Sequence, residues 1–122
     1  MANTKSEIGS YGEDLACKYL VSNDYKIIER NFRKPWGEID IIAKDKDQTV
    51  VFVEVKTLRK SFNLMPEDNM SQAKITKIKR TASLWVGFND NKIDPNKGFR
   101  VDLVAIELLN IDNPVIRHYQ NL

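Results

Sequence analysis

Residues 38–56 read EIDIIAKDKDQTVVFVEVK. Two apolar runs rich in β-branched residues, 38–43 and 49–56, are separated by a short polar segment. This pattern predicts two β-strands that pair as an antiparallel hairpin. Each run is interrupted by one acidic residue, Asp40 in the first strand and Glu54 in the second.

The segments on both sides of this hairpin carry further helix and strand patterns. In chain order they predict a helix over 7–22 capped by Ser6, a strand over 25–33, a polar loop over 57–70, a helix over 71–86, a strand over 99–109 and an edge strand over 114–119. Apolar residues at helical spacing identify the helices, and clustered β-branched residues identify the strands. The order helix, three strands, helix, strand predicts a mixed α/β fold with helices packed against a sheet.

Length and composition restrict the class of protein. We expect residues 1–122 to form a single domain, and a content of 42% hydrophobic and 30% charged residues is typical of a globular fold. The net charge of +2 is too small to indicate a nucleic-acid partner by itself. A single cysteine, Cys17, excludes an internal disulfide framework and a cysteine zinc cluster. No apolar stretch has the length of a membrane span or signal segment, so we expect a cytoplasmic protein.

The two acidic residues in the hairpin predict a metal site. A carboxylate inside a buried strand costs several kcal/mol unless it is paired or binds a metal ion. If the hairpin turns about Asp47, Asp40 lies opposite or next to Glu54, with Cβ atoms about 5 Å apart. Two carboxylates at that distance remain ionised only when a cation lies between them. Oxygen ligands without His or Cys favour Mg²⁺ or Mn²⁺.

Two further residues fit the same site. Lys56 shares a strand face with Glu54, because side chains alternate between faces, and it can orient a water or stabilise developing charge. Glu13, on the first predicted helix, can reach the site from above the sheet. A hard cation, a positioned water and a lysine suit hydrolysis of a phosphodiester. The alternative is that Glu54 and Lys56 simply pair on a solvated face, although Asp40 in its apolar run fits this alternative less well.

Several short motifs along the chain resemble those of a known family. They are Gly12-Glu13 with Ala16, Tyr19 and Leu20; Gly37-Glu38-Ile39-Asp40; Phe52-Val53-Glu54-Val55-Lys56; Lys74 with Ala82-Ser83-Leu84-Trp85; and Arg100-Val101-Asp102-Leu103-Val104. This set resembles the YraN-like family of uncharacterised bacterial proteins. That family is similar to the PD-(D/E)xK nuclease superfamily, which includes restriction endonucleases and archaeal Holliday-junction resolvases. The resemblance implies a restriction endonuclease-like αβββαβ core, in which helices flank a mixed central sheet.

The resemblance also implies roles for individual residues. Asp40, Glu54 and Lys56 match the catalytic residues of the D…(D/E)-x-K signature, and Glu13 matches the helix-borne acid of the resolvase-like branch. The implied metal ligands are Asp40, Glu54 and Glu13. One departure from the signature is Ile39, which stands directly before the aspartate where the superfamily has proline.

Basic residues are concentrated directly after the acidic pair. Residues 56–80 include seven basic and two acidic residues. The candidate nucleic-acid contacts are Lys74, Lys77, Arg59, Lys60 and Trp36. The two helix lysines lie off the apolar stripe of the helix, where they can contact phosphates or form an ordinary solvated face. The tryptophan can stack on a base or pack within its turn.

Three other residues are expected to be structural. Asp102 lies on an apolar strand, where we expect it to form a cap or an ion pair rather than to join the acidic cluster. His118 is the only histidine and is expected on the surface or on an edge strand. Cys17 is expected to be partly buried in the first helix.

The sequence therefore supports three functional hypotheses. The first is a Mg²⁺-dependent endonuclease that hydrolyses phosphodiester bonds in DNA, including branched or structured DNA. The second is a non-catalytic nucleic-acid-binding module with a nuclease-like fold. The third is a protein-interaction scaffold in which the acidic residues are structural. A homodimer through an exposed sheet edge or a helix is compatible with a nuclease of this size, since such enzymes engage two strands.

Overall fold

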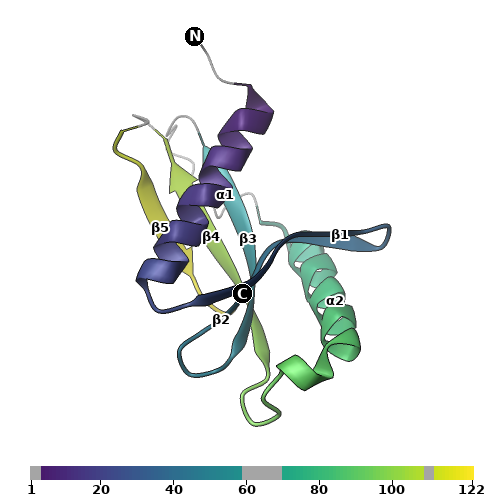
Figure 1. Cartoon of the computed structure of the whole chain (residues 1–122). Coiled ribbons are helices and arrows are strands. Elements are labelled where there is room, and N and C mark those ends of the chain that lie inside the picture. Colours follow the sequence, from purple (N-terminus) through teal and green to yellow (C-terminus); the bar gives the residue numbers. More distant parts are fainter. Residues whose placement is uncertain (1–3, 59–69, 109–111) are drawn as a thin grey trace.

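The computed structural model of the chain describes residues 4–58, 70–108 and 112–122 (Figure 1). In chain order its elements are α1 (Lys5–Ser22), β1 (Lys26–Lys34), β2 (Gly37–Lys44), β3 (Val50–Leu58), α2 (Gln72–Phe88), the short 3₁₀ helix η2 (Asp90–Lys92), β4 (Phe99–Glu107) and β5 (Val115–Tyr119). This order confirms the predicted mixed α/β fold with an αβββαβ core and an added edge strand.

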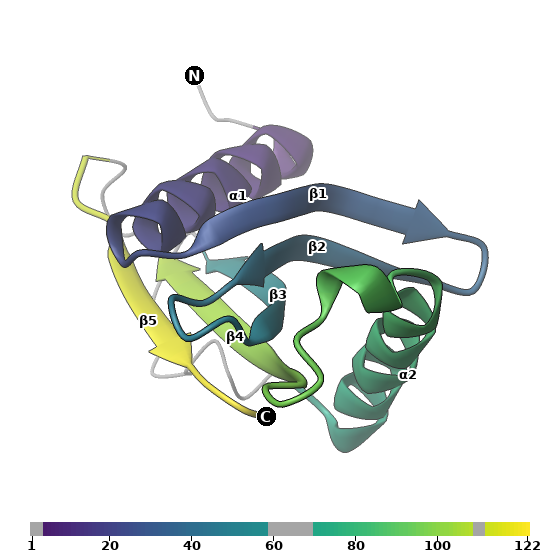
Figure 2. The same cartoon turned by 60° about the horizontal axis from the view of Figure 1, so that its bottom comes forward.

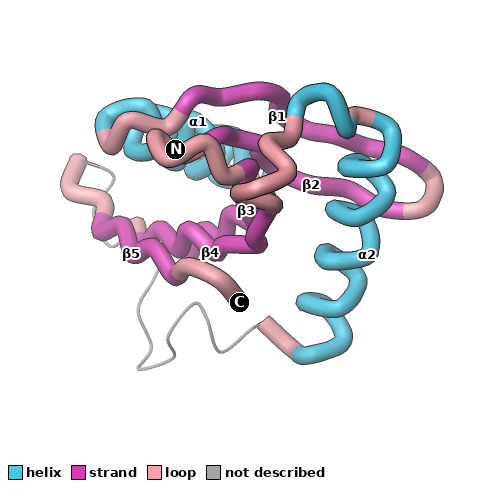
Figure 3. The backbone as a smooth tube through the Cα atoms, turned by 90° about the horizontal axis from the view of Figure 1, so that it is seen from below, coloured by secondary structure: helices cyan, strands magenta, loops and turns pink. Residues whose placement is uncertain are grey.

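The five strands form one mixed sheet in the order β1-β2-β3-β4-β5. β3 and β4 run parallel, and the other neighbouring strands are antiparallel. A parallel pair needs a crossover connection, and the connection from β3 to β4 contains α2. Figure 3 shows β1 and β2 reaching toward α2, while β5 lies away from it.

Two apolar layers hold one long helix on each face of the sheet. The layer beneath α1 contains Ile8, Ala16, Leu20, Tyr25, Ile41, Ala43, Val51, Val53, Val104, Ile106 and Leu108. The layer beneath α2 contains Phe32, Ile39, Ile42, Val50, Phe52, Ile78, Ala82, Trp85 and Val101. Because neighbouring strand residues such as Ile41 and Ile42 belong to different layers, the two helices cover opposite faces.

The predicted β2–β3 hairpin and its register are confirmed. Ile41 pairs with Val53, and Lys44 pairs with Val50. Continuing this register by one residue aligns Asp40 with Glu54, as the sequence predicts. The short polar turn between the strands therefore determines which acidic residues meet.

β2 extends beyond its partner β3. It pairs with β1 from Gly37 to Lys44, but with β3 only from Ile41 onward. The end of the β1–β2 hairpin consequently runs past β3 and beside α2 (Figure 2). Gly37 permits this close approach, because a Cβ atom at that position would clash with the side chain of Thr81 on α2.

Some predicted boundaries are corrected by the structure. Thr4, rather than Ser6, caps α1, because its hydroxyl accepts a hydrogen bond from the amide of Glu7. Ser71 caps α2 by accepting a hydrogen bond from the amide of Lys74. The predicted loop over 57–70 begins too early, because β3 continues to Leu58 in register with β4.

The part of the chain that the structure describes contains no helix long and apolar enough to cross a membrane.

Candidate active site

The site lies where β2 separates from β3. Oδ2 of Asp40 accepts a 2.8 Å hydrogen bond from the backbone amide of Val55, at a position where β2 no longer pairs with β3. The carboxylate of Asp40 therefore bonds to the amide that directly follows Glu54. The two acidic side chains converge, and both line the same two clefts.

The electrostatics of Asp40 reflect this convergence. Burial, the negative charge of Glu54 and a hydrogen bond with that side chain raise the pKa of Asp40 from 3.8 to about 6. The hydrogen bond from Val55 works in the opposite direction but does not cancel the increase. A half-buried carboxyl group beside a second acid thus holds its proton more tightly than usual, and a bound cation would reverse this preference.

Two lysines compensate the charge of Glu54. Its Oε1 lies 3.2 Å from Nζ of Lys74 and 3.9 Å from Nζ of Lys56. Burial and contact with Lys74 lower the pKa of Lys56. Burial alone would also lower the pKa of Lys74, but its hydrogen bond with Lys56 and the charge of Glu54 raise it. The two amino groups therefore lie side by side at Glu54, and their pKa values shift in opposite directions.

Two clefts open onto the acidic pair. The first, of about 440 Å³, lies on the α1 side and includes Glu13, Lys56 and Thr57 in its lining. The second, of about 370 Å³, lies on the α2 side and includes Lys74 and Lys77. Asp40 and Glu54 are therefore accessible from either cleft, and each cleft combines carboxylates with at least one lysine.

Glu13 lies near the acidic pair but is not part of it. Burial and the negative charge of Asp40 raise the pKa of Glu13, so the two carboxyl groups sense each other across the first cleft. Gly12 brings this part of α1 close to β3, because a Cβ atom there would clash with Thr57. Among the described residues, no three His, Cys, Asp or Glu side chains lie close enough to hold a metal ion as a group.

The residues present fit a hard divalent cation held by two carboxylates. Asp40 uses Oδ2 for the amide of Val55, and burial together with the negative charge of Glu54 raises its pKa to about 6. Asp40 and Glu54 would be the protein ligands, with Glu13 facing the same cleft. Oxygen donors without nitrogen or sulfur suit Mg²⁺ or Mn²⁺, which normally retain several waters.

The chain matches the model of the uncharacterised protein family UPF0102 over residues 12–106. It belongs to this family. The UPF0102 proteins of Trichlorobacter lovleyi and Geobacter sulfurreducens are 38% and 41% identical to it over 114 residues, which is 93% of this chain and 87% and 86% of theirs. This membership confirms the resemblance to YraN-like proteins, and the matched region contains Glu13, Asp40, Glu54 and Lys56.

One solved structure with a similar arrangement is a repair endonuclease from Pyrococcus abyssi. It shares 17% identity with this UPF0102 protein, and the alignment covers 86% of this chain and 38% of that enzyme with a TM-score of 0.48. The chain therefore spans less than two-fifths of the length of that enzyme.

The candidate nucleic-acid contacts fall into three groups in this UPF0102 protein. Lys74 contacts Glu54 directly, and Lys77 lines the same cleft as an exposed side chain. Trp36 lies outside both clefts, in the β1–β2 turn, where its ring is edge-on to Phe32 at a centroid distance of 5.8 Å. Arg59 and Lys60 lie outside the described residues.

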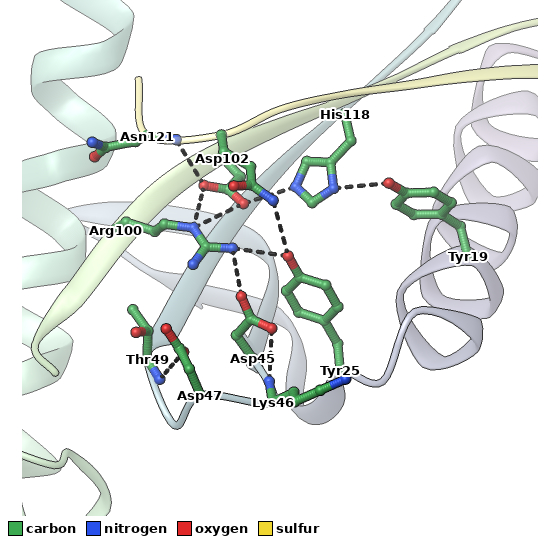
Figure 4. A network of polar contacts seen from close by, with 11 residues as sticks. Tyr19, Tyr25, Asp45, Lys46, Asp47, Thr49, Arg100, Asp102, His118 and Asn121 are labelled. Carbon is green, nitrogen blue, oxygen red and sulfur yellow. Dashed lines mark hydrogen bonds and ion pairs between the residues drawn. The ribbon is translucent and has the colours of Figure 1, made fainter.

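A second polar network lies away from the acidic pair (Figure 4). Asp102 is fully buried and accepts hydrogen bonds from Arg100 at 3.0 Å and from the amide of Asn121 at 3.0 Å, and it lies 2.7 Å from Nε2 of His118. The other ring nitrogen of His118 contacts the hydroxyl of Tyr19 at 2.9 Å. The expectation of a structural role for Asp102 is therefore confirmed.

The expectation that His118 lies on the surface or on an edge strand is confirmed for the edge strand, β5. Its side chain is only 8% exposed, because it lies between Tyr19 and Asp102. Sequence spacing could not reveal this contact, since Tyr19 and His118 are 99 positions apart. Cys17 is partly buried, as expected.

Proposed function

We propose that this UPF0102 protein is a metal-dependent nuclease that hydrolyses phosphodiester bonds in DNA, including branched or structured DNA. The observation that carries the proposal is the convergence of Asp40 and Glu54 at the end of the β2–β3 pairing, with Lys56 and Lys74 beside them. Carboxylates, a cation and a lysine form a combination suited to phosphoryl chemistry.

The acidic pair would provide the metal site. A divalent cation held by Asp40 and Glu54 would polarise the scissile phosphate and lower the pKa of a bound water. The raised pKa of Asp40 supports this role, because such a carboxyl group gains most from a positive neighbour. Glu13 would orient ligands or water from the α1 side of the cleft.

The two lysines would have different roles. Lys56 has a lowered pKa and lies beside the acidic pair, so it is suited to exchange a proton with the attacking water or to orient it. Lys74 has a raised pKa and remains a cation, which suits contact with a phosphate oxygen. Both amino groups lie beside Glu54, at 3.9 Å for Lys56 and 3.2 Å for Lys74, so each is close enough to the acidic pair to contact a substrate bound there.

The proposal is tested by incubating the full chain with linear, nicked, flapped and four-way DNA in Mg²⁺ or Mn²⁺. We expect cleavage of at least one substrate, and loss of that cleavage in Asp40→Asn and Glu54→Gln. Asp90→Asn is the matched control, because Asp90 is an exposed acidic residue on η2 that lines neither cleft. Undiminished cleavage by both site variants would refute the mechanism.

The same experiment distinguishes the non-catalytic alternative. DNA binding with a steep dependence on salt, without cleavage and without a divalent-ion site detected by calorimetry, would identify a nucleic-acid-binding module instead. Failure to bind either DNA or RNA at low salt would leave only the protein-interaction hypothesis.

A further inference from the structure

A third cleft, here called the aromatic cleft, lies beyond the candidate active site. It has a volume of about 410 Å³, and its lining includes Glu29, Phe32, Lys34, Trp36, Trp85 and Phe88. These residues come from β1, the β1–β2 turn and the end of α2. The cleft is therefore formed where the extended hairpin meets the helix.

Two aromatic side chains of this cleft are exposed to solvent. Phe88 is 78% exposed and Trp36 is 37% exposed, whereas Trp85 is buried and forms the wall of the cleft. Exposed aromatic groups gathered at one place indicate a binding surface more often than isolated ones do. They come from separate elements, so together they can contact the face of a planar ligand.

Positive charge accompanies these rings. Nζ of Lys34 lies 5.8 Å from the ring centroid of Phe32, and Nζ of Lys92 lies 6.0 Å from that of Trp85. Lys92 also belongs to a neighbouring cleft of about 570 Å³, whose lining includes the four lysines Lys26, Lys44, Lys46 and Lys92 and the two aspartates Asp24 and Asp45. An apolar peptide would not need this charge, whereas unpaired nucleotides present both a stacking face and a phosphate.

The aromatic cleft contains one acidic residue, Glu29, whose carboxylate is engaged in a hydrogen bond and is therefore a weak source of repulsion for a phosphate. Oε1 of Glu29 accepts a hydrogen bond of 3.4 Å from the indole nitrogen of Trp85. Its carboxylate is thus directed to the wall of the cleft. Lys34 lines the cleft, and the amino group of Lys92 lies 6.0 Å from the ring centroid of Trp85, so both are within reach of phosphates beside a ligand that contacts the aromatic rings.

The aromatic cleft and the cleft at the acidic pair are both lined by residues of α2. Thr81 of α2 lines the cleft at the acidic pair, and Trp85, one helical turn later, lines the aromatic cleft. On the strand side, Trp36 precedes Asp40 by four residues, which corresponds to about 13 Å of extended chain. One nucleic-acid strand can therefore contact both places.

We propose that the aromatic cleft binds an unpaired base of DNA, with Trp36 and Phe88 stacking on it and Lys34 and Lys92 contacting the adjacent phosphates. The substrate of this protein would then be DNA with a single-stranded segment beside the scissile bond. The position of the cut rests on the nuclease function proposed above, whereas the binding of the base does not.

Binding is measured by fluorescence anisotropy with the full chain in EDTA, so that no cleavage occurs. Three labelled DNAs are compared: a blunt duplex, the same duplex with a short single-stranded overhang, and that overhang with abasic sites in place of its bases. We expect the intact overhang to bind about tenfold more tightly than the other two, because stacking requires the bases while charge does not.

Substitutions test which residues of the aromatic cleft produce the preference for the intact overhang. Trp36→Ala and Phe88→Ala are expected to lower affinity for the intact overhang several-fold and to leave the blunt duplex unchanged, whereas Trp36→Phe retains most of the preference. Lys34→Gln is expected to weaken binding of intact and abasic overhangs equally and to reduce the salt dependence. Leu84→Ala is the control, because Leu84 is 38% exposed on the same helix but does not line the cleft.

Equal affinities for intact and abasic overhangs, or an unchanged preference in the Trp36→Ala/Phe88→Ala double variant, would overturn the assignment of the cleft. The experiments distinguish failure of the base-binding proposal from failure of the proposed nuclease function. Cleavage of blunt DNA without an overhang preference refutes only the cleft, and aromatic-dependent binding without cleavage in Mg²⁺ or Mn²⁺ refutes only the nuclease.

Discussion

The carboxylate of Asp40 accepts a hydrogen bond from the backbone amide of Val55, which follows Glu54 directly in the chain. This bond replaces the backbone pairing that β2 and β3 lose beyond Ile41 and Val53. It keeps one oxygen of Asp40 engaged and places its carboxyl group beside Glu54. The strand divergence therefore creates both the opening of the site and its acidic pair.

The raised pKa of Asp40 predicts how stability depends on pH. The folded chain holds this proton more tightly than the unfolded chain, so the free energy of unfolding falls as pH rises from about 4 to about 6. Asp40→Asn keeps an oxygen for the amide of Val55 but cannot ionise. We expect it to be more stable than wild type by about 2 kcal/mol at pH 8 in chelator, and about equally stable at pH 4. Thermal denaturation at both pH values, with the exposed Asp90→Asn as control, measures this difference. An Asp40→Asn variant less stable at pH 8 would contradict the electrostatic account.

The opposite pKa shifts of Lys56 and Lys74 predict different responses of the two residues to replacement by arginine. Arginine stays charged at any relevant pH, so Lys56→Arg cannot exchange a proton with water, and we expect at least a hundredfold loss of kcat. Lys74→Arg keeps the positive charge and is expected to retain most activity, while Lys74→Ala raises KM. Steady-state kinetics on the DNA substrate that is cleaved measures kcat and KM for each variant. Full activity of Lys56→Arg would show that this residue acts only through its charge.

Two glycines of α1 predict opposite effects of the same substitution. Gly9 has open space where the methyl group of an alanine would lie, so Gly9→Ala should stabilise the helix by about 1 kcal/mol. Gly12→Ala should destabilise the protein by about 1–3 kcal/mol, because its methyl group would clash with Thr57 on β3. Urea denaturation compares the two variants. In the double variant Gly12→Ala/Thr57→Ala we expect part of the lost free energy of unfolding to be recovered. If none is recovered, the clash with Thr57 is not the cause of the destabilisation.

The buried network around Asp102 predicts a stability effect. Burial raises the pKa of Asp102, but hydrogen bonds from His118 and Asn121 outweigh it and hold the pKa below its ordinary value. The ionised carboxylate therefore contributes stability above about pH 4, and this stability is lost as pH falls through the folded pKa. Asp102→Asn should cost about 3 kcal/mol at pH 7, because it leaves Arg100 without its buried partner. Thermal denaturation measures the loss, with the exposed Asp90→Asn as control. An equal loss of stability in Asp102→Asn and Asp90→Asn would contradict a stabilising role for the network around Asp102.

The meeting of Asp40 and Glu54 was predictable because the interactions that produce it are local. Alternation along each strand and a short polar turn determine the hairpin register, and the structure confirms that register. The approach of α1 to this site was not predictable from periodicity. The position of Glu13 was implied by family resemblance, whereas the glycine contact that brings α1 close depends on the packing of Gly12 against Thr57.

The contacts made by α2 and β5 required the tertiary structure. The sequence predicts Lys74 as an exposed cation, but its ion pair with Glu54 exists only because α2 packs beside the extended end of β2. In the same way, His118 is predicted as an edge-strand residue, and only the folding of β5 beside β4 places it between Tyr19 and Asp102. Side chains far apart in the chain carry no periodic signal of their contact.

By itself, the sequence determined the order of helices and strands, the hairpin register and the family of this protein. Those properties arise from neighbouring residues, whose spacing directly selects helix or strand and directs side chains to one face or the other. The tertiary structure alone decided which lysines neutralise Glu54, how Asp102 is buried and where Trp36 and Phe88 form a cleft. These outcomes depend on how helices pack across the sheet, because contact between distant segments is decided by shape and burial over the whole fold.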